Sequence, residues 1–545
     1  MRILHSRWSI AVLLGAIALA VVGMALGSAL FSAKAAAPVS TYIVLYNAGA
    51  RANQATLKAH GHTIIRDFSQ AGLLIVRSSN PADLATMPGV SGVAQDGLHM
   101  KIPTDEGAAI KSAPGKPKGC SSTTKTCPFQ WDMARMHLPQ AWRTTQGSAS
   151  VRVAVLDTGL RSTHEEVGSN YNAIASRSFV QPSPACPQDA NTYSSTEDFN
   201  GHGTWTNLHV AGINGPLMTG IAPASTLINI RVLGACGSGT DSWILTGMLY
   251  GNEVGARIES MSLGGFLCAD GIVPGSAYCG TKEQVGDQPV IYRAYQQVVN
   301  YLLKHGTLVI AASGNEHVQL DQQGRVRSVG SAAYSSPKND PKNDLRGTTE
   351  IPGGLPGVVS VAAVNRITGL APSKAATKFG QFGTGLRDQL TYYSNYGPRI
   401  DVSAPGGSRN YNIPKSDCLS DSCARLDPSA PTASDNPGDF GAWAVDASGK
   451  PCNTCYMNVQ GTSMATPQVA GVAALALAAH PSLTATQLSQ LLRRSVTEFF
   501  NTNATPPISS NPAQPTYNYS LDYSAPGISN RQMGSGVIDA AVAVN

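Results

Sequence analysis

The sequence predicts an α/β protein with a mainly parallel central sheet. From Cys120 onward, short continuous apolar runs alternate with helical stretches, and strands buried on both faces have this pattern. The runs end in small or polar residues, as in "VRVAVLDTG", "RIESMSLGG" and "GTLVIAASGNE". Functional loops gather at the carboxyl ends of such strands. We therefore expect Asp157, Ser262, Asn315 and Pro405 to lie at or just past strand ends.

Composition is typical of a globular protein with a large core. The chain has 545 residues, of which 42% are hydrophobic and 13% charged. This balance argues against a disordered chain. The formal net charge is only +5 and no Lys/Arg block stands out, so we expect no nucleic-acid partner.

The first 37 residues have the pattern of an export signal. Arg2 and Arg7 precede an apolar stretch without charge, and "AKAAAPVS" then supplies small residues, with cleavage expected after Ala37. Residues 1–37 are therefore interpreted as a signal peptide of a secreted or periplasmic protein. Because about 20 apolar residues can span a bilayer, an uncleaved membrane anchor is the alternative, and only this anchor would make the membrane a partner.

Three further segments follow. Residues 38–100 alternate strand and helix patterns, beginning with the strand "TYIVLYN", and form a small unit without cysteine. Residues 101–119 are rich in Pro, Gly and Lys, which is typical of an exposed linker that proteases can cut. Residues 120–545 carry the parallel-sheet pattern. Within this last segment, three stretches have turn composition and are interpreted as insertions: Phe266–Gln288, His317–Leu355 and Ser408–Met457.

All ten cysteines lie beyond residue 100. An even count in an exported chain favours disulfides. Pairing near neighbours leaves one long-range pair, and the expected set is Cys120–Cys127, Cys268–Cys279, Cys418–Cys423, Cys452–Cys455 and Cys186–Cys236, although sequence alone leaves other connectivities open. Cys452 and Cys455 could instead form half of a zinc site or a redox pair. No matching Cys/His pair lies nearby, which favours the disulfide.

Four polar residues stand where acyl-transfer chemistry would need them. Asp157 ends an apolar strand, His202 follows a glycine turn, Asn315 ends another strand, and Ser463 opens a long apolar helix. A serine hydroxyl needs a base to take its proton, and imidazole titrates near neutrality. A buried carboxylate fixes the imidazole tautomer. A helix N-terminus and a side-chain amide can both donate hydrogen bonds to the oxyanion.

These four clusters resemble the signatures of the subtilases, the subtilisin-like serine proteases. "AVLDTG", "NGHGT", "AASGNE" and "GTSMATPQVAG" occur in the family's order of Asp, His, Asn and Ser. Weaker matches, such as "FQWDMARMHLPQAW" and "GSGVIDAAVAV", extend the resemblance over about residues 128–545. It implies a subtilisin-like three-layer fold, catalytic Asp157, His202 and Ser463, and Asn315 in the oxyanion hole.

The resemblance also implies a propeptide and a substrate-binding strand. Thr41–Asp96 is similar to the family's inhibitory propeptide, a small α+β domain that would act as an intramolecular inhibitor. Ser262, Leu263 and Gly264 would pair with the main chain of protein or peptide substrates, a mode largely independent of side chains. The chemistry requires no cofactor or metal. Many subtilases bind structural calcium, but no ligand set can be matched in this sequence.

The stretch "NGHGTWTNLHVAG" contains two histidines, His202 and His209. In the family, His-Gly-Thr runs directly into "HVAG", whereas "WTNL" separates them here. Alignment on "NGHGT" makes His202 the base, and alignment on the helix body puts Thr206 in its place. We choose His202, because the glycine turn presents it at the helix start. The four residues must then loop out, or lengthen the helix by about one turn, with Trp205 and Leu208 packed as that turn.

Three functional hypotheses remain. The leading one is an exported serine endopeptidase. The second is a binding protein on a protease scaffold, inactive because "WTNL" displaces the base. The third is a membrane-anchored processing enzyme. A lipase-type hydrolase is disfavoured because no "GxSxG" frames Ser463, and an aspartic protease because "DTG" occurs once.

Overall fold

The structure is a computed structural model. It describes residues 38–47, 54–102, 130–213, 215, 217–328, 344–366, 387–391, 393–407, 439–497 and 532–545. The first 37 residues lie outside this set, as do most of the predicted linker and the cysteines at 120, 127, 418 and 423.

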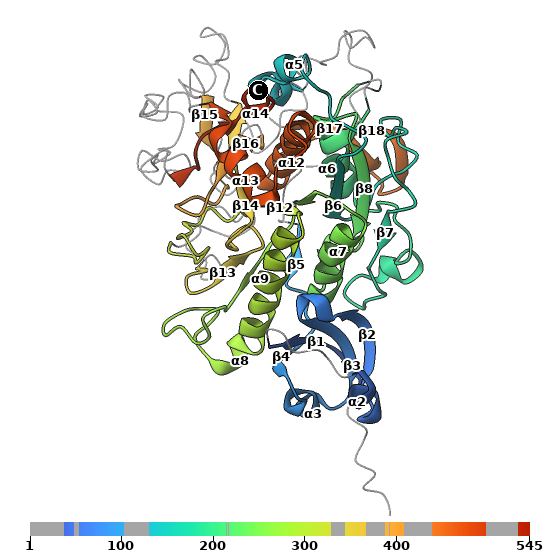
Figure 1. The fold of residues 1–545 in the computed structure, drawn as a ribbon, viewed down its shortest axis with the longest axis vertical. Helices are drawn as coiled ribbons and strands as arrows, with labels where there is room; N and C mark the ends of the chain where they lie inside the picture. Colours follow the sequence, from blue (N-terminus) through green and yellow to red (C-terminus); the bar gives the residue numbers. More distant parts are fainter. Residues whose placement is uncertain are drawn as a thin grey trace, which may run out of the picture.

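A large, mainly parallel sheet forms the centre of the molecule (Figure 1). Its strand order is β19-β20-β16-β14-β12-β10-β6-β8-β7, and β15 pairs with β14. All neighbours along this order are parallel except β19 and β20, and β15 is antiparallel to β14. The strands are β6 (Arg152–Asp157), β7 (Arg177–Ser178), β8 (Thr226–Arg231), β10 (Ile258–Met261), β12 (Leu308–Ala312), β14 (Val359–Arg366), β15 (Arg387–Leu390), β16 (Val402–Pro405), β19 (Val496–Thr497) and β20 (Val537–Ile538). The predicted mainly parallel sheet is confirmed.

Helices cover both faces of this sheet and make three layers. Alternate residues of β6 face opposite ways, so Val153 and Val155 join one apolar cluster while Ala154 and Leu156 join the other. The first cluster includes α6 (His202–Ala211), α12 (Thr462–Ala479), α13 (Ala485–Arg494) and α14 (Ala540–Ala543). The second includes α7 (Asp241–Glu253) and α9 (Gln288–Lys304). This is the three-layer α/β fold predicted from the sequence.

Short elements complete the large unit. Two antiparallel pairs formed within the described part of the large unit lie outside the central sheet: β11 with β13, and β17 with β18. Their bounds, with those of the short helices, are β11 (Gly265–Leu267), β13 (Thr349–Ile351), β17 (Asp439–Val445), β18 (Pro451–Val459), α4 (Trp131–Arg135), α5 (Leu138–Ala141), α8 (Lys282–Val285) and the 3₁₀ helix η2 (Pro187–Asn191). The three stretches interpreted as insertions thus contain β11 and α8, then β13, and then β17 with most of β18.

Helix α12 is buried in the core of the large unit. Among the described residues it is the helix that is long and apolar enough, by length and composition, to cross a membrane. Since 89% of that segment is buried within the protein, the pattern has the ordinary explanation of a core helix.

The N-terminal unit is a separate four-stranded antiparallel sheet, drawn in blue in Figure 1, in the order β2-β3-β1-β4. One face packs on its own two helices, and the other joins the apolar cluster of α7 and α9. The elements are β1 (Ser40–Tyr46), α2 (Gln54–Ala59), β2 (Thr63–Phe68), η1 (Ser69–Ala71), β3 (Leu73–Ser78), α3 (Pro81–Thr86), β4 (Val90–Gln95) and β5 (Met100–Lys101).

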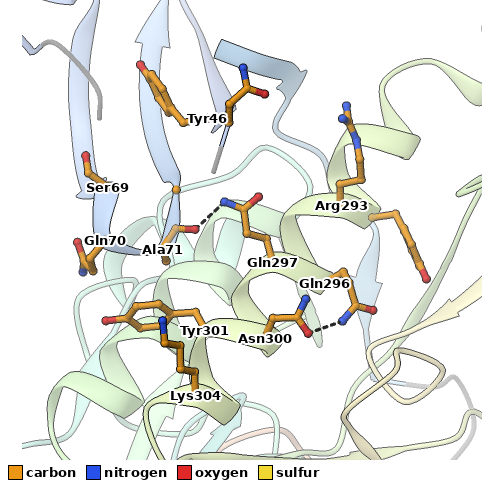
Figure 2. A pocket seen from close by; sticks show the side chains of 13 residues that line it. Tyr46, Ser69, Gln70, Ala71, Arg293, Gln296, Gln297, Asn300, Tyr301 and Lys304 are labelled. Atoms are coloured by element: carbon orange, nitrogen blue, oxygen red, sulfur yellow. Dashed lines mark hydrogen bonds between the residues drawn. The ribbon is translucent and has the colours of Figure 1, made fainter. Parts of the chain in front are cut away.

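A polar cavity of about 790 Å³ lies between this unit and α9 (Figure 2). Figure 2 shows Gln297 of α9 reaching the carbonyl of Ala71, and the hydrogen bond is 2.7 Å long. Tyr46, Gln70 and Arg293 are among the residues that line the cavity. The contact between the two units is therefore apolar in one part and polar in another.

A cluster of titratable groups crosses the same interface. Asp96 accepts hydrogen bonds from the backbone and hydroxyl of Ser242, at 2.8 and 2.6 Å, in the first turn of α7. His99 Nδ1 lies 2.6 Å from Oδ2 of the buried Asp241, whose Oδ1 accepts from Tyr295 at 3.1 Å. Burial raises the pKa of Asp96 to about 6, and the Asp241 charge adds to this effect. Burial also raises the pKa of Asp241.

The pKa of His99 is raised as well. Burial lowers it, but the hydrogen bond and charge of Asp241 outweigh burial. The pKa values of all three groups lie above their ordinary values in the docked state. A state in which these groups are exposed and apart would bind protons less tightly. The resulting stabilisation is complete below the ordinary carboxyl pKa of about 4 and is lost as the pH rises through about 6 for Asp96.

Three disulfides join the described cysteines: Cys186–Cys236, Cys268–Cys279 and Cys452–Cys455. These are three of the five predicted pairs. The other two lie outside the described residues. Since Cys452 and Cys455 are bonded to each other, the zinc alternative is wrong.

We predict that docking of the N-terminal unit weakens as the pH rises from 5 to 8. The test is a chain cut at an engineered site in the linker and passed over a sizing column at several pH values. More of the N-terminal unit should co-elute with the large unit at pH 5 than at pH 8. Asp96→Asn should flatten this dependence, because the side chain no longer titrates. Equal or tighter association at pH 8 would contradict the prediction.

Candidate active site

Asp157 and His202 meet at the carboxyl edge of the central sheet. Asp157 is the last residue of β6 and His202 the first of α6, and both are buried. His202 Nδ1 lies 2.8 Å from Asp157 Oδ1. The Thr206 hydroxyl, one helical turn later, donates to Asp157 Oδ2 at 3.1 Å. With the proton on Nδ1 the ring donates to the carboxylate, and Nε2 on the far side of the ring is then the basic nitrogen.

A second buried carboxylate, Asp198, fixes the turn before α6. Its oxygens accept hydrogen bonds from the backbone N–H groups of Asn200, Gly201 and Thr204 at 2.8–2.9 Å. They also accept from the hydroxyls of Thr204 and of Thr158 beside Asp157, at 2.8 and 2.9 Å. A carboxylate at a helix N-terminus is favourable both for hydrogen bonding and for the helix dipole. Asp198 therefore ties the start of α6 to the end of β6.

The two glycines that flank His202 are required by this geometry. Gly201 has φ +114°, a conformation that side chains rarely adopt. A Cβ on Gly203 would lie 2.3 Å from the Gly159 carbonyl oxygen, so α6 can approach the end of β6 only with glycine there. The "GHG" sequence thus has a local structural cause.

The four residues "WTNL" are part of α6, which runs without interruption from His202 to Ala211. They do not loop out. Trp205 and Leu208 are fully buried, as expected if they pack as a helical turn. His209 is also fully buried, stacks on the Trp205 ring with 3.4 Å between ring centroids, and has Nε2 3.5 Å from Asp132. His209 thus lies in the core and contacts a different carboxylate from the one that His202 contacts.

Ser463 stands in the first turn of α12, directly after Thr462. It is fully buried, and its hydroxyl donates to the Ser262 carbonyl at 3.2 Å. The Ser262 hydroxyl in turn donates to the Ser463 carbonyl at 2.7 Å. Helix α12 packs directly against α6. Among the described residues, the hydrogen bond that Ser463 Oγ donates therefore goes to the Ser262 carbonyl.

Asn315 follows β12 and lies against the start of α12. Its Oδ1 accepts from the Thr462 backbone and hydroxyl at 2.9 and 2.7 Å, so the amide nitrogen is turned away from Thr462. A second asparagine, Asn395, holds this loop. Its Oδ1 accepts from the backbone of Glu316 and Val318, and its Nδ2 donates to the Ser313 carbonyl at 2.7 Å.

The strand predicted to bind substrate already has a partner in this structure. Lys101 and Gly264 exchange two backbone hydrogen bonds, of 3.2 and 3.1 Å. On its other side, Met100–Lys101 pairs antiparallel with β9 (Ser238–Gly239), and the Ile102 N–H donates to the Gly237 carbonyl at 2.8 Å. The end of the N-terminal unit therefore lies as a strand between Gly237–Gly239 and Ser262–Gly264.

No calcium site can be assigned at the buried carboxylate of Glu166 from the described residues. Its Oε1 accepts from the backbone of Leu217 and Met218 and from the Tyr456 hydroxyl at 2.7–3.1 Å. These three donors satisfy Oε1, and burial raises the pKa of the side chain to about 7. No group of three His, Cys, Asp or Glu suited to a metal occurs among the described residues, and we derive no step through calcium.

Two residues of this site were missed in the sequence analysis. Asp198 lies four residues before His202, and Asn395 lies in "SNYGP". An acidic residue shortly before a helix start is a capping signal and could have identified Asp198. No pattern in the sequence links Asn395 with Asn315, because 80 residues separate them.

Comparison with known proteins places this geometry in a family. The family model "Subtilase family" matches residues 148–536, more than half of the chain. Subtilisin Savinase of Lederbergia lenta is 26% identical over 374 residues, covering 68% of this chain and 93% of its own. M-protease of Shouchella clausii (strain KSM-K16) is 26% identical over 382 residues, covering 70% of this chain and 68% of its own.

A solved structure supports the same fold. The epidermin leader peptide processing serine protease of Staphylococcus aureus superposes with a TM-score of 0.62 at 18% identity, over 93% of this chain and 98% of that one. The family match, the named relatives and this shared fold agree with the predicted resemblance. The chain belongs to the subtilase family and is a serine endopeptidase.

Proposed function

We propose that this subtilase is an exported endopeptidase that cuts protein substrates through an acyl-enzyme on Ser463. His202 serves as general base and acid, Asp157 orients it, and Asn315 helps to bind the oxyanion. The observation that carries this assignment is the 2.8 Å contact between His202 Nδ1 and the buried Asp157 carboxylate. This contact favours His202 over His209, which contacts Asp132.

The reaction begins when Ser463 Oγ turns from the Ser262 carbonyl toward His202. Nε2 of His202 takes the hydroxyl proton while Oγ attacks the substrate carbonyl carbon. The imidazolium formed is stabilised by Asp157, which remains ionised. His202 then gives the proton to the departing amine, and a water molecule repeats the sequence to release the acid.

Two donors stabilise the oxyanion. The Ser463 N–H lies in the first turn of α12, where backbone donors have no partner within the helix and the dipole favours negative charge. The Asn315 amide is held by Thr462 on its oxygen side, so its nitrogen is directed to the opposite side. The loss of one such donor costs about 10²–10³ in rate.

Substrate binds as a β-strand, and the N-terminal unit blocks this binding. Its residues Met100–Ile102 already pair with Gly264 and with Gly237–Gly239, the place that substrate main chain would take beside Ser262–Gly264. We infer that residues 38–100 act as an inhibitory propeptide, which leaves once the linker at 101–119 is cut. The polar, titratable interface with α7 and α9 suits a partner that must be released.

Export is supported by the three disulfides of the described residues, because such bonds persist in oxidising compartments. Relatives of this chain include subtilisins. A membrane-anchored form, with residues 1–37 uncleaved, is the alternative. The inactive binding protein depended on displacement of His202 by "WTNL", and the bond to Asp157 argues against that displacement.

We predict that a fluorophosphonate probe labels the mature protein, and that Ser463→Ala abolishes labelling. The probe requires an activated serine hydroxyl, which the substitution removes. Intact-protein mass should increase by one adduct in the wild type only. Absence of labelling in folded protein freed of its N-terminal unit would favour the binding reading.

The two histidines should respond differently to substitution. His202→Ala should lower peptide hydrolysis by about 10⁴-fold, because the general base is lost. Its loss of stability should be smaller than that of His209→Ala, because Asp157 keeps hydrogen bonds from the Thr158 N–H and the Thr206 hydroxyl. His209→Ala should retain most activity when folded. It should lower the free energy of unfolding by roughly 3–5 kcal/mol, because Asp132 is left buried without its partner. Peptidase assays and denaturant unfolding measure both effects. An active His202→Ala protein beside an inactive, stable His209→Ala protein would reverse the assignment.

A further inference from the structure

Two glutamates lie beside the strand that pairs with Lys101. Glu350 is the middle residue of β13, which pairs with β11 directly after Gly264. A Cβ on Gly264 would lie 3.0 Å from Glu350 Oε1, so the carboxylate stands directly next to this strand. Glu316 follows Asn315 in sequence, and its Oε2 accepts from Asn395 at 3.1 Å.

The Glu350 carboxylate has no counter-charge of its own. The residue is 1% exposed, and among the described residues neither oxygen has a hydrogen-bond partner in proper geometry. Burial, with a further contribution from the Glu316 charge, raises its pKa well above the usual range. The backbone N–H groups of Gly354 and Gly353 and the charge of Arg399 act against this rise. The Arg399 guanidinium, however, is committed to Asp401 and to three carbonyl oxygens, those of Gly354, Leu355 and Val358.

Burial of a carboxylate without a counter-charge costs free energy. We therefore expect a cation that is not part of the large unit to pair with Glu350. Burial raises the pKa of Glu316, and the hydrogen bond from Asn395 and the Lys101 ammonium of the N-terminal unit act against this rise. A metal ion is a poor candidate, because no third acidic or histidine ligand completes a group in the described part of the chain. A Lys or Arg side chain of the substrate would supply the charge and several donors.

The strand register identifies the substrate residue. Lys101 opposes Gly264, so a substrate residue two positions further along would oppose Ser262, whose carbonyl accepts the Ser463 hydroxyl. The carbonyl of that residue is the one Ser463 and Asn315 can reach. Its side chain points to the same side as the residue opposite Gly264, where Glu350 and Glu316 stand.

We propose that Glu350 and Glu316 make this enzyme selective for substrates with Lys or Arg on the amino side of the cleaved bond. The inference rests on the proposed function, because it uses Ser463 and Asn315 to locate the scissile carbonyl. The buried Glu350 carboxylate binds the terminal cation, and the partly exposed Glu316 adds a second negative charge.

The test uses mature protein and peptides that differ only at this residue: Arg, Lys, Gln, Leu and Glu. We expect kcat/KM for Arg and Lys to exceed that for Gln and Leu by roughly 100-fold, since a site built around a buried charge rejects ligands that leave it unpaired. Glu350→Gln should abolish this preference by lowering the rate for Arg and Lys, with cleavage after Leu unchanged or improved. Glu316→Gln should weaken the preference partly.

Glu259→Gln is the matched control. Glu259 lies in β10, is fully buried, and faces Gly251 of α7. Burial raises its pKa as it does that of Glu350. This variant should keep the preference for basic residues, which separates loss of a particular charge from loss of any buried charge. Thermal unfolding of each variant establishes that it is folded.

The outcomes distinguish the two levels of the proposal. Cleavage of all peptides at similar rates by the wild type would overturn the selectivity and leave the proposed function intact. Loss of the preference on adding a chelator would also overturn it, because a metal would then provide the recognition. Failure of folded, mature protein to cut any peptide or to react with a fluorophosphonate would overturn the proposed function itself.

Discussion

The hydrogen bond between Asp157 and His202 depends on a constraint that shapes much of this structure: α6 must begin where β6 ends. Parallel strands deliver their carboxyl ends to one edge of the sheet, and Asp157 is the last residue of its strand. Asp198 then binds the first turn of α6 to the loop after β6 through Thr158 and Thr204. The side chain at the first helical position is thereby directed onto the carboxylate.

The same constraint explains why the four residues "WTNL", which separate the His202 motif from "HVAG", do not displace His202. Because α6 is anchored at its N-terminal end, the four residues that separate His202 from "HVAG" extend along the helix instead of displacing its start. Trp205 and His209 stack within the core, and the second histidine lies against Asp132. A helix held at its first turn can vary further along without moving its first residue.

Much of the fold could be predicted from local patterns, because each central strand is a short apolar run with a polar terminus. The positions of Asp157, Ser262 and Asn315 at strand ends followed from the same reasoning. Contacts that join distant segments could not be predicted. Asn395 holds the Asn315 loop across 80 residues, and Glu350 reaches Gly264 through β13, which lies within a stretch interpreted only as an insertion. Local periodicity carries no information on which such loops fold back together.

The N-terminal unit and the two glutamates, Glu316 and Glu350, lie beside the same strand of the large unit, Ser262–Gly264. The Lys101 backbone forms two hydrogen bonds with the Gly264 backbone, and the Glu350 carboxylate lies next to Gly264. Main-chain pairing there can hold any extended segment, so under the proposed function the N-terminal unit and a substrate would compete for one set of backbone groups. Selectivity must then come from side chains next to the strand, and the buried carboxylate is the most strongly polar group in that place.

The most direct measurement of the central claim is the protonation state of the His202 ring. Nitrogen NMR of histidine-labelled Ser463→Ala protein at pH 8, with the resonance assigned through a His202→Gln variant, reports which ring nitrogen carries the proton. The account predicts the proton on Nδ1, hydrogen-bonded to Asp157, with Nε2 unprotonated and able to act as the base. A proton on Nε2, with Nδ1 unprotonated, would contradict it.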